Sequence, residues 1–260
     1  MKPSISKLRF LSTALAAFLT FGSVAAAATF SVDPIVVSLS RTGTSATIAV
    51  ANQSSSTLRL QVTGFAWQQS ASGQIELAPS DDLVIFPQLL TLDPGETRRI
   101  RVGTTAAQGP HESTFRIFLE ELPSLQAVTA KAGATLNIRM KIGIPVFLNP
   151  TSQRQVSGAV QNIAVNDGSL DFDVVNTGNT HFSIAQVHVV GRNPAGASVF
   201  TRNVDGWYVL AGGVRRYAIK LPKAACEAMT SVTVGVRTDA PSFSNSVSSL
   251  RKQCTSGTGR

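Results

Sequence analysis

The residues of this sequence that could carry out chemistry are few and scattered. Its three histidines, His111, His181 and His188, have no cluster of cysteines or carboxylates beside them at the spacing of metal ligands. The sequence motifs of a nucleophile elbow, a phosphate-binding loop and a zinc-protease helix do not occur. A serine–histidine–aspartate triad assembled from distant segments leaves no sequence signature, and no local context supports one. We therefore predict no enzyme, no metal site and no cofactor.

One cation stands in a segment that otherwise suits the interior of a sheet. Arg116 lies within the run 114–119, Thr-Phe-Arg-Ile-Phe-Leu, at a position where an aromatic or aliphatic residue is usual. A half-buried guanidinium needs an anionic partner. That anion could be internal, because Glu120 and Glu121 follow on the same strand and Glu120 shares the face of Arg116. It could instead be supplied by a binding partner.

Two further cations, Arg139 and Lys141, lie on the polar side of the segment 134–148. In an immunoglobulin-type sandwich the sixth and seventh strands are neighbours. The segments that contain Arg116 and Lys141 are predicted to be those two strands. Arg116 is therefore expected to converge with Lys141, or with Arg139, at one cleft, and the sequence leaves open which of the two it is.

The opposite face of the same segment carries a long apolar row. Its members are Leu136, Ile138, Met140, Ile142, Ile144 and Val146. So many apolar side chains on one face exceed what a single strand of a small sandwich needs for its own core. One interpretation is that all of them still pack into that core. The other, which we favour, is an edge strand whose apolar row extends past the core and is open to pairing with another chain.

The rest of the chain must supply the sheets that position these residues. Apolar and polar residues alternate over short segments separated by turn signals, and no segment of ten residues has convincing helical periodicity. In the first half, seven strands are expected, at 30–40, 44–51, 58–67, 74–77 together with 83–86, 97–102, 114–121 and 134–148. The pattern predicts an all-β protein with two immunoglobulin-like sandwiches. We place the first domain at 29–149, a linker that contains Pro150 at 150–154, and the second domain at 155–260.

The first 28 residues predict export. Basic residues near the start precede an apolar stretch that ends in a run of small residues. This is the pattern of a cleavable signal peptide, with cleavage expected near Ala27 or Ala28. A membrane anchor is the alternative, but serines and threonines interrupt the apolar run. No later stretch is long and apolar enough to span a bilayer, so we expect no stable membrane insertion.

Charge and cysteine content narrow the function further. Removing the leader's three basic residues leaves 20 Lys and Arg against 15 Asp and Glu, a net charge of +5. The cations are scattered and lack interleaved aromatic residues, so we expect no nucleic-acid partner. Cys226 and Cys254 could form one disulfide in an oxidising compartment, which would stabilise the fold by about 3–4 kcal/mol in the chain-entropy model. Two unpaired thiols are the alternative.

An ordered set of motifs in the first domain resembles the periplasmic pilus chaperones of the PapD-like superfamily. The set consists of Val32-Asp33-Pro34, Gly64-Phe65-Ala66-Trp67, Phe86-Pro87, Leu92-Asp93-Pro94-Gly95-Glu96, Arg99-Ile100-Arg101-Val102 and the run 112–123. The seventh strand completes the set. The Pro-Gly-Glu turn alone is a weak signal, but the ordered set is specific, with a sixth strand that begins Glu-Ser-Thr-Phe-Arg and ends Glu-Leu-Pro. In the second domain the resemblance is weaker and rests on Asn176-Thr177-Gly178-Asn179.

This resemblance implies a boomerang of two immunoglobulin-like domains that acts in the periplasm as a chaperone. Its partners would be pilin subunits that lack a final strand, and an outer-membrane usher that receives them. The seventh strand would complete the subunit by donor-strand complementation; chaperone–pilin complexes are a standard example of such β-augmentation. The donor residues would be Leu136, Ile138, Met140, Ile142 and Ile144. Arg116, with Lys141 or Arg139, would anchor the terminal carboxylate of the subunit.

The sequence departs from the main branch of this family at two positions. That branch anchors the carboxylate with a first-strand arginine and a seventh-strand lysine, whereas this chain has Val36 and Pro145 near those positions. An arginine in place of the sixth-strand aromatic residue resembles the archaic or alternative branch, which assembles spore-coat-like pili. The alternative function is a secreted β-sandwich adhesin or carbohydrate-binding module. That function would need solvent-facing aromatic rings, for which Trp67, Trp207 and Tyr208 are the candidates.

Overall fold

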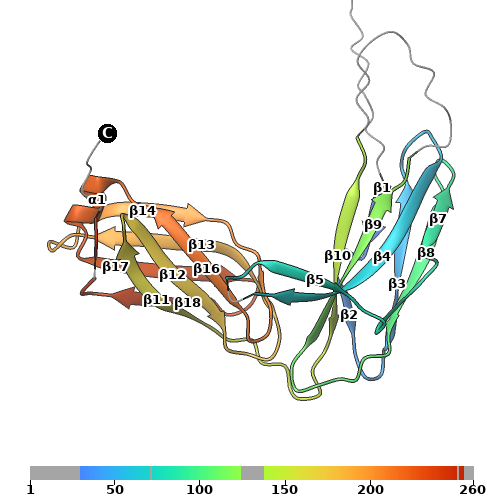
Figure 1. Ribbon diagram of the computed structural model, residues 1–260, viewed down its shortest axis with the longest axis horizontal. Coiled ribbons are helices and arrows are strands. Elements are labelled where there is room, and N and C mark those ends of the chain that lie inside the picture. The colour runs from blue at the N-terminus through green and yellow to red at the C-terminus, as the bar shows by residue number, and fades with distance from the viewer. Residues whose placement is uncertain (1–29, 71, 124–137, 251, 255–260) are drawn as a thin grey trace, which may run out of the picture.

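The computed structural model describes residues 30–70, 72–123, 138–250 and 252–254. The expected signal peptide, residues 1–28, and Leu136 of the apolar row lie outside these residues. Within them the chain forms two groups of sheets and one short helix, α1 (Lys223–Ala228). Figure 1 shows the two groups as separate lobes set at an angle to each other. The predicted all-β fold of two sandwiches is therefore confirmed. No helix of the described ranges is long and apolar enough to cross a membrane.

The first domain is a sandwich of two sheets. Its strands are β1 (Phe30–Asp33), β2 (Val37–Leu39), β3 (Ser45–Asn52), β4 (Leu58–Gln69), β5 (Ile75–Pro79), β6 (Leu83–Phe86), β7 (Leu89–Leu92), β8 (Thr97–Thr104), β9 (Ser113–Glu121) and β10 (Lys141–Leu148). One sheet has the order β1-β3-β8-β6. The other has the order β2-β10-β9-β4-β5, with β7 also paired to β4. The predicted sixth and seventh strands, β9 and β10, are thus direct neighbours.

Three features of these strands differ from the sequence prediction. The expected strand 30–40 is divided into β1, which pairs with β3, and β2, which pairs with β10. Between them lies Pro34, which cannot donate a ladder hydrogen bond. β7 is an additional strand. Of the expected seventh strand 134–148, residues 134–137 lie outside the described ranges and residues 138–140 belong to no strand, so β10 begins at Lys141.

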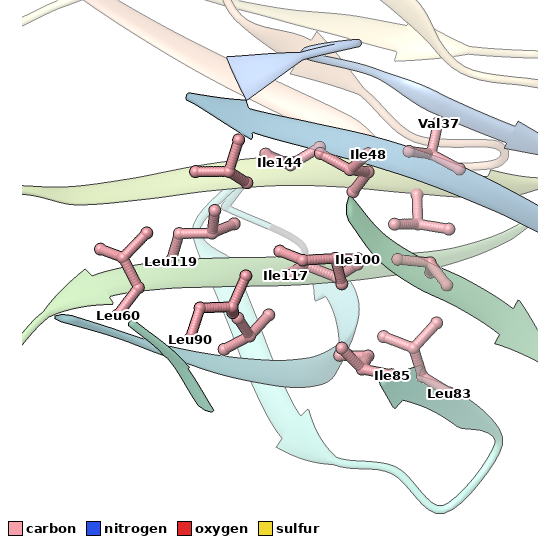
Figure 2. Packing of buried hydrophobic residues seen from close by; sticks show 14 of the residues in the cluster. Val37, Ile48, Leu60, Leu83, Ile85, Leu90, Ile100, Ile117, Leu119 and Ile144 are labelled. Atoms are coloured by element: carbon pink, nitrogen blue, oxygen red, sulfur yellow. The ribbon is translucent and has the colours of Figure 1, made fainter. Parts of the chain in front are cut away.

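The core of the first domain is formed by the inward side chains of both sheets. Its fully buried residues include Ile48, Ile100, Ile117, Leu119 and Ile144. Figure 2 shows Ile144 of β10 among them, between the two sheets. Alternate residues of each strand supply this layer, because successive side chains of a strand point to opposite faces. Burying one side chain of this size contributes about 1.5–3 kcal/mol.

The second domain is also built from two sheets. Its strands are β11 (Gly158–Asn166), β12 (Ser169–Asn176), β13 (Phe182–Arg192), β14 (Ser198–Val204), β15 (Tyr208–Val209), β16 (Val214–Lys220), β17 (Ser231–Thr238) and β18 (Phe243–Val247). One sheet has the order β11-β12-β16. The other has the order β14-β13-β17-β18, with β15 also paired to β13.

The C-terminal segment of the second domain is tied to α1. Cys226 of α1 and Cys254 form a disulfide with a Cα–Cα distance of 5.9 Å. The Nζ atom of Lys252 donates hydrogen bonds to the carbonyl oxygens of Cys226, Glu227 and Met229 at 3.2, 2.6 and 2.9 Å. The last carbonyl groups of a helix lack partners within the helix, so Lys252 satisfies the end of α1.

A polar and aromatic junction joins the two domains. Glu112, buried just before β9, accepts a hydrogen bond from the backbone N–H of His181 at 2.9 Å and lies 2.6 Å from the Nδ1 atom of the same residue. The His181 ring stacks on Phe147 of β10, with 3.6 Å between ring centroids. His181 immediately precedes β13. Its contacts therefore belong to the junction.

The β4–β5 hairpin provides a second set of junction contacts. Figure 1 shows it reaching from the first lobe toward the second. The Nε2 atom of Gln69 donates to the Tyr208 carbonyl at 2.8 Å, and its Oε1 atom accepts from the Leu210 backbone N–H at 2.9 Å. Trp67 and Phe147 form a buried cluster with Leu210. These contacts fix the loop around β15 against the sheet that carries β9 and β10.

Candidate partner-binding site

β10 has an unpaired edge along the first part of its length. On one side it pairs with β9 throughout, from Lys141 opposite Glu120 to Leu148 opposite Ser113. On its other side, within the described ranges, β2 pairs with Val146–Leu148 alone. In the described part of the chain, no strand therefore pairs with the backbone groups of residues 141–144 that point away from β9, and unpaired edge groups can accept another strand. An open edge of this kind is the template for β-augmentation.

The apolar row of this segment is shorter than the sequence predicts. Ile144, an expected member of the donor row, is fully buried in the core of its own domain, so its side chain is not accessible to a partner in this structure. The reason is that the facing sheet covers the strand from Ile144 onward. Met140 and Ile142 are partly buried against the same core. Ile138 is 66% exposed and is the most available described member of the row.

Arg116 lies on the other face of this sheet, which is turned toward the second domain. On β9 it is opposite Pro145 of β10 and Phe65 of β4. Its Nε and Nη1 atoms are buried and have no hydrogen-bond partner among the residues that the structure describes. Unpaired buried donors are costly to a protein. The arrangement suits a guanidinium whose partner is an anionic ligand.

Three aromatic rings surround this guanidinium. The Cζ atom of Arg116 lies 5.0 Å from the ring centroid of Trp67, 5.9 Å from that of Phe118 and 5.4 Å from that of Trp207. Burial lowers the pKa of the Arg116 guanidinium from its ordinary value, and the nearby Tyr208 acts in the opposite direction. Arginine nevertheless stays charged in proteins. It is therefore a partly desolvated cation, and its attraction for a carboxylate is stronger than it would be in water.

Gly143 of β10 leaves the space in which the guanidinium lies. A Cβ atom at this position would be 2.8 Å from the Nε atom of Arg116, 3.2 Å from its Nη2 atom and 3.0 Å from the Cε1 atom of Phe118. A larger residue would force the end of the Arg116 side chain to move, because that end is more flexible than the strand. Gly143 is therefore part of the Arg116 site.

Lys141 approaches the same ring as Arg116. Its Nζ atom lies 5.0 Å from the centroid of Phe118 and 2.8 Å from the Oε2 atom of Glu120. The alternative in which Glu120 pairs with Arg116 is therefore wrong. The hydrogen bond from Lys141 lowers the pKa of Glu120, and the charge of Arg139 adds a smaller effect in the same direction. Arg139 itself is exposed and precedes β10.

The rings on which the adhesin alternative depends have other contacts. Trp67 is buried at the junction, and Tyr208 packs edge-on against it with 5.5 Å between centroids. Trp207 is 37% exposed but lies over Arg116. None of the three is a free platform for a sugar. The described part of the chain also contains no group of three or more His, Cys, Asp or Glu residues that could hold a metal ion.

Sequence reasoning missed three parts of this region. The contact of Trp207 with Arg116, and that of His181 with Glu112, join different domains, and no local pattern reports such contacts. Gly143 did leave a signal, because a glycine inside a strand often marks the close approach of another group. The sequence alone could not say which group that would be.

The fold and the site define a class of protein: two linked β-sandwich domains with an open strand edge and a desolvated arginine near their junction. Residues 29–154 match a family described as "Pili and flagellar-assembly chaperone, PapD N-terminal domain". The N-terminal domain of the chain therefore matches the PapD-like pilus chaperones, which confirms the resemblance inferred from its sequence motifs. The family is one of chaperones and not of enzymes. A search of the curated proteins finds no match to this sequence.

Solved structures agree on the fold. The chain is similar to a chain of the CsuC–CsuE chaperone–tip subunit pre-assembly complex from archaic chaperone-usher Csu pili of Acinetobacter baumannii, with a TM-score of 0.58, 15% identity, and coverage of 87% of this chain and 100% of that one. For the chaperone YadV the TM-score is 0.57 at 12% identity, covering 84% and 98%. For the Salmonella enterica complex of pilin SafA with chaperone SafB it is 0.55 at 15% identity, covering 85% and 97%. At these identities the likeness shows the fold alone.

Proposed function

We propose that this protein is a periplasmic chaperone that binds pilin subunits, completes them by donor-strand complementation and delivers them to an outer-membrane usher. The observation that carries the proposal is the open edge of β10 with exposed Ile138 and half-buried Met140 and Ile142 beside it. A subunit strand added at this edge would form backbone hydrogen bonds with β10. The alternate apolar side chains of the chaperone segment would enter the groove of the subunit. The signal peptide predicted from the sequence at residues 1–28 agrees with this location.

Arg116 supplies the second part of the proposal, which is an anchor for the terminal carboxylate of the subunit. A guanidinium forms strong charge-assisted hydrogen bonds to a carboxylate, and the buried Nε and Nη1 donors of Arg116 have no described partner. Lys141 is the second cation, since it shares the Phe118 ring with Arg116. Its bond to Glu120 is exposed, and exposed ion pairs are weak enough to be exchanged for another anion.

The two parts have different tasks. Each apolar side chain buried in a subunit groove contributes about 1.5–3 kcal/mol before the costs of association. The row should therefore dominate affinity. The cations should fix the register, because a slip of one residue would turn every side chain to the wrong face. The use of Arg116 as the anchor supports the archaic or alternative branch of the family.

The proposal also has support from the complexes that resemble this chain. CsuC is a chaperone in complex with a tip subunit, and SafB is a chaperone in complex with a pilin. We infer that the client here is likewise an incomplete subunit, and that an usher receives it.

Co-expression with a pilin subunit from a neighbouring gene tests the proposed function. We expect a 1:1 complex on size-exclusion chromatography and a subunit that becomes resistant to proteolysis. The control is the same subunit with an added C-terminal strand that fills its own groove, which should no longer bind. Equal binding of the self-complemented subunit would contradict donor-strand complementation.

Replacing Gly143 by valine should displace the Arg116 guanidinium and weaken subunit binding by about tenfold or more, the value of a charged hydrogen bond. The strand should still form, because valine favours β-structure. Yield of co-purified subunit and thermal unfolding of the free chaperone measure the two effects.

Gly235→Val is the matched control for this change. Gly235 lies inside β17, and a Cβ atom there would meet nothing closer than the His188 carbonyl oxygen at 3.8 Å. It should leave subunit binding unchanged. Unchanged binding by Gly143→Val as well would show that the position of Arg116 does not matter to the client.

A further inference from the structure

The second domain contributes a side chain to the surroundings of Arg116. Trp207 lies in the loop between β14 and β15, and its ring centroid is 5.4 Å from the Cζ atom of Arg116. The other two rings around the guanidinium, Trp67 and Phe118, belong to the first domain. The Arg116 site is therefore assembled from both domains.

The backbone around Trp207 is held closely against β13. The Trp207 carbonyl accepts a hydrogen bond from the Ile184 backbone N–H at 3.1 Å. The preceding residue, Gly206, approaches so closely that a Cβ atom there would lie 2.2 Å from both the Cβ and Cγ2 atoms of Ile184. Only a glycine fits this approach. The loop is thus built to bring Trp207 to a defined place.

The ring itself is also oriented by its neighbours. It stands edge-to-face on Tyr208, with 5.7 Å between centroids and an interplanar angle of 88°. Tyr208 in turn stands edge-to-face on Trp67 with an angle of 85°. Trp207, Tyr208 and Trp67 thus form a continuous row of edge-to-face rings. This row runs from the second domain to the first-domain ring that contacts Arg116.

Packing into the core of its own domain does not explain the position of the Trp207 ring. It is 37% exposed and is not a member of the core of the second domain. What its ring does contact is a guanidinium with two buried donors that lack described partners. A ring in this place excludes water from the cation and strengthens its attraction for an anion.

We propose that Trp207 is a positioning residue of the carboxylate anchor, through which the second domain covers Arg116 and sets the affinity of the site for a terminal carboxylate. The proposal rests on the proposed function, since it assigns Arg116 the same ligand. It adds that the anchor is complete only when both domains are in their observed arrangement.

A small carboxylate tests this proposal without a subunit. The probe is N-acetyl-phenylalanine, whose free carboxylate resembles a chain end, and the readout is the Nε–H resonance of Arg116 in ¹⁵N-labelled full-length protein. Trp207→Ala should weaken binding by roughly 3- to 30-fold, the range of a cation–π contact. Trp207→Phe should stay within about threefold of the wild type, since a ring remains. The amide of the same probe should leave the resonance unchanged in every variant.

Controls separate positioning from general damage. Phe86→Ala removes an aromatic ring that is 76% exposed on β6, and it should bind the probe like the wild type. Trp207→Leu keeps an apolar side chain without a ring, and it repeats the test if the alanine variant unfolds. Wild-type affinity in a folded Trp207→Ala or Trp207→Leu protein would overturn the role of Trp207 alone. No response of Arg116 to the probe in the wild type would instead overturn the anchor within the proposed function.

Discussion

Replacing Ile138 by aspartate should abolish the capture of pilin subunits while the chaperone stays folded. Ile138 is 66% exposed and precedes β10, so its own domain loses little. In the groove of a subunit, the change would remove about 1.5–3 kcal/mol of apolar burial. It would also place a carboxylate in an apolar environment, at a cost of several kcal/mol more. Together these effects correspond to a loss of affinity of about a thousandfold or more, measured as the yield of subunit that co-purifies with the chaperone.

Two further variants serve as controls for this result. Phe86→Asp changes a still more exposed apolar residue on β6, at the edge of the other sheet, and it should leave capture intact. Ile144→Asp changes a residue with no exposed surface in the core, and it should unfold the first domain. If the Ile138→Asp protein retains its subunit, the apolar row is not the element that enters the client.

The strands of the first domain could be predicted because alternation reports the face of each side chain directly. It placed Ile138 and Ile144 on one face of the seventh strand and Lys141 on the other. Alternation does not report how far the facing sheet extends. Ile144 therefore looked like Ile138 in the sequence, although one lies in the core and the other is exposed. That difference is set by packing between sheets, which is tertiary.

The same limit applies to the charged side of the site. Arg116 and Lys141 could be placed near one cleft because neighbouring strands in a sandwich follow from its topology. Which acid pairs with which cation depends on register, and the register sets Glu120 opposite Lys141. The part played by Trp207 depends on how the domains sit together. That arrangement rests on Glu112, Gln69 and their partners in the second domain, and no sequence pattern connects these residues.

Replacing Arg116 by methionine should separate what the residue does for the client from what it does for the chaperone. Methionine keeps a long side chain among the rings of Trp67, Phe118 and Trp207 but donates no hydrogen bond. Subunit binding should fall by about 10- to 150-fold, the equivalent of a charged hydrogen bond worth about 1.5–3 kcal/mol. Thermal unfolding of the free chaperone should be unchanged or shift to higher temperature, because two buried unpaired donors are removed.

Weaker subunit binding together with unchanged or higher thermal stability would distinguish a ligand-binding arginine from a structural one. A structural arginine would stabilise the free protein, so its loss would lower the unfolding temperature. A ligand-binding arginine is held desolvated at a cost that the ligand offsets.

The subunit affinity of Arg116→Lys should fall between those of the methionine variant and the wild type, because lysine keeps the charge but not the planar fork. Lys141→Met should have a smaller effect, since its charge is already paired with Glu120 at an exposed position. Equal capture by the methionine variant and the wild type, or marked destabilisation of the free methionine variant, would show that Arg116 is not the anchor.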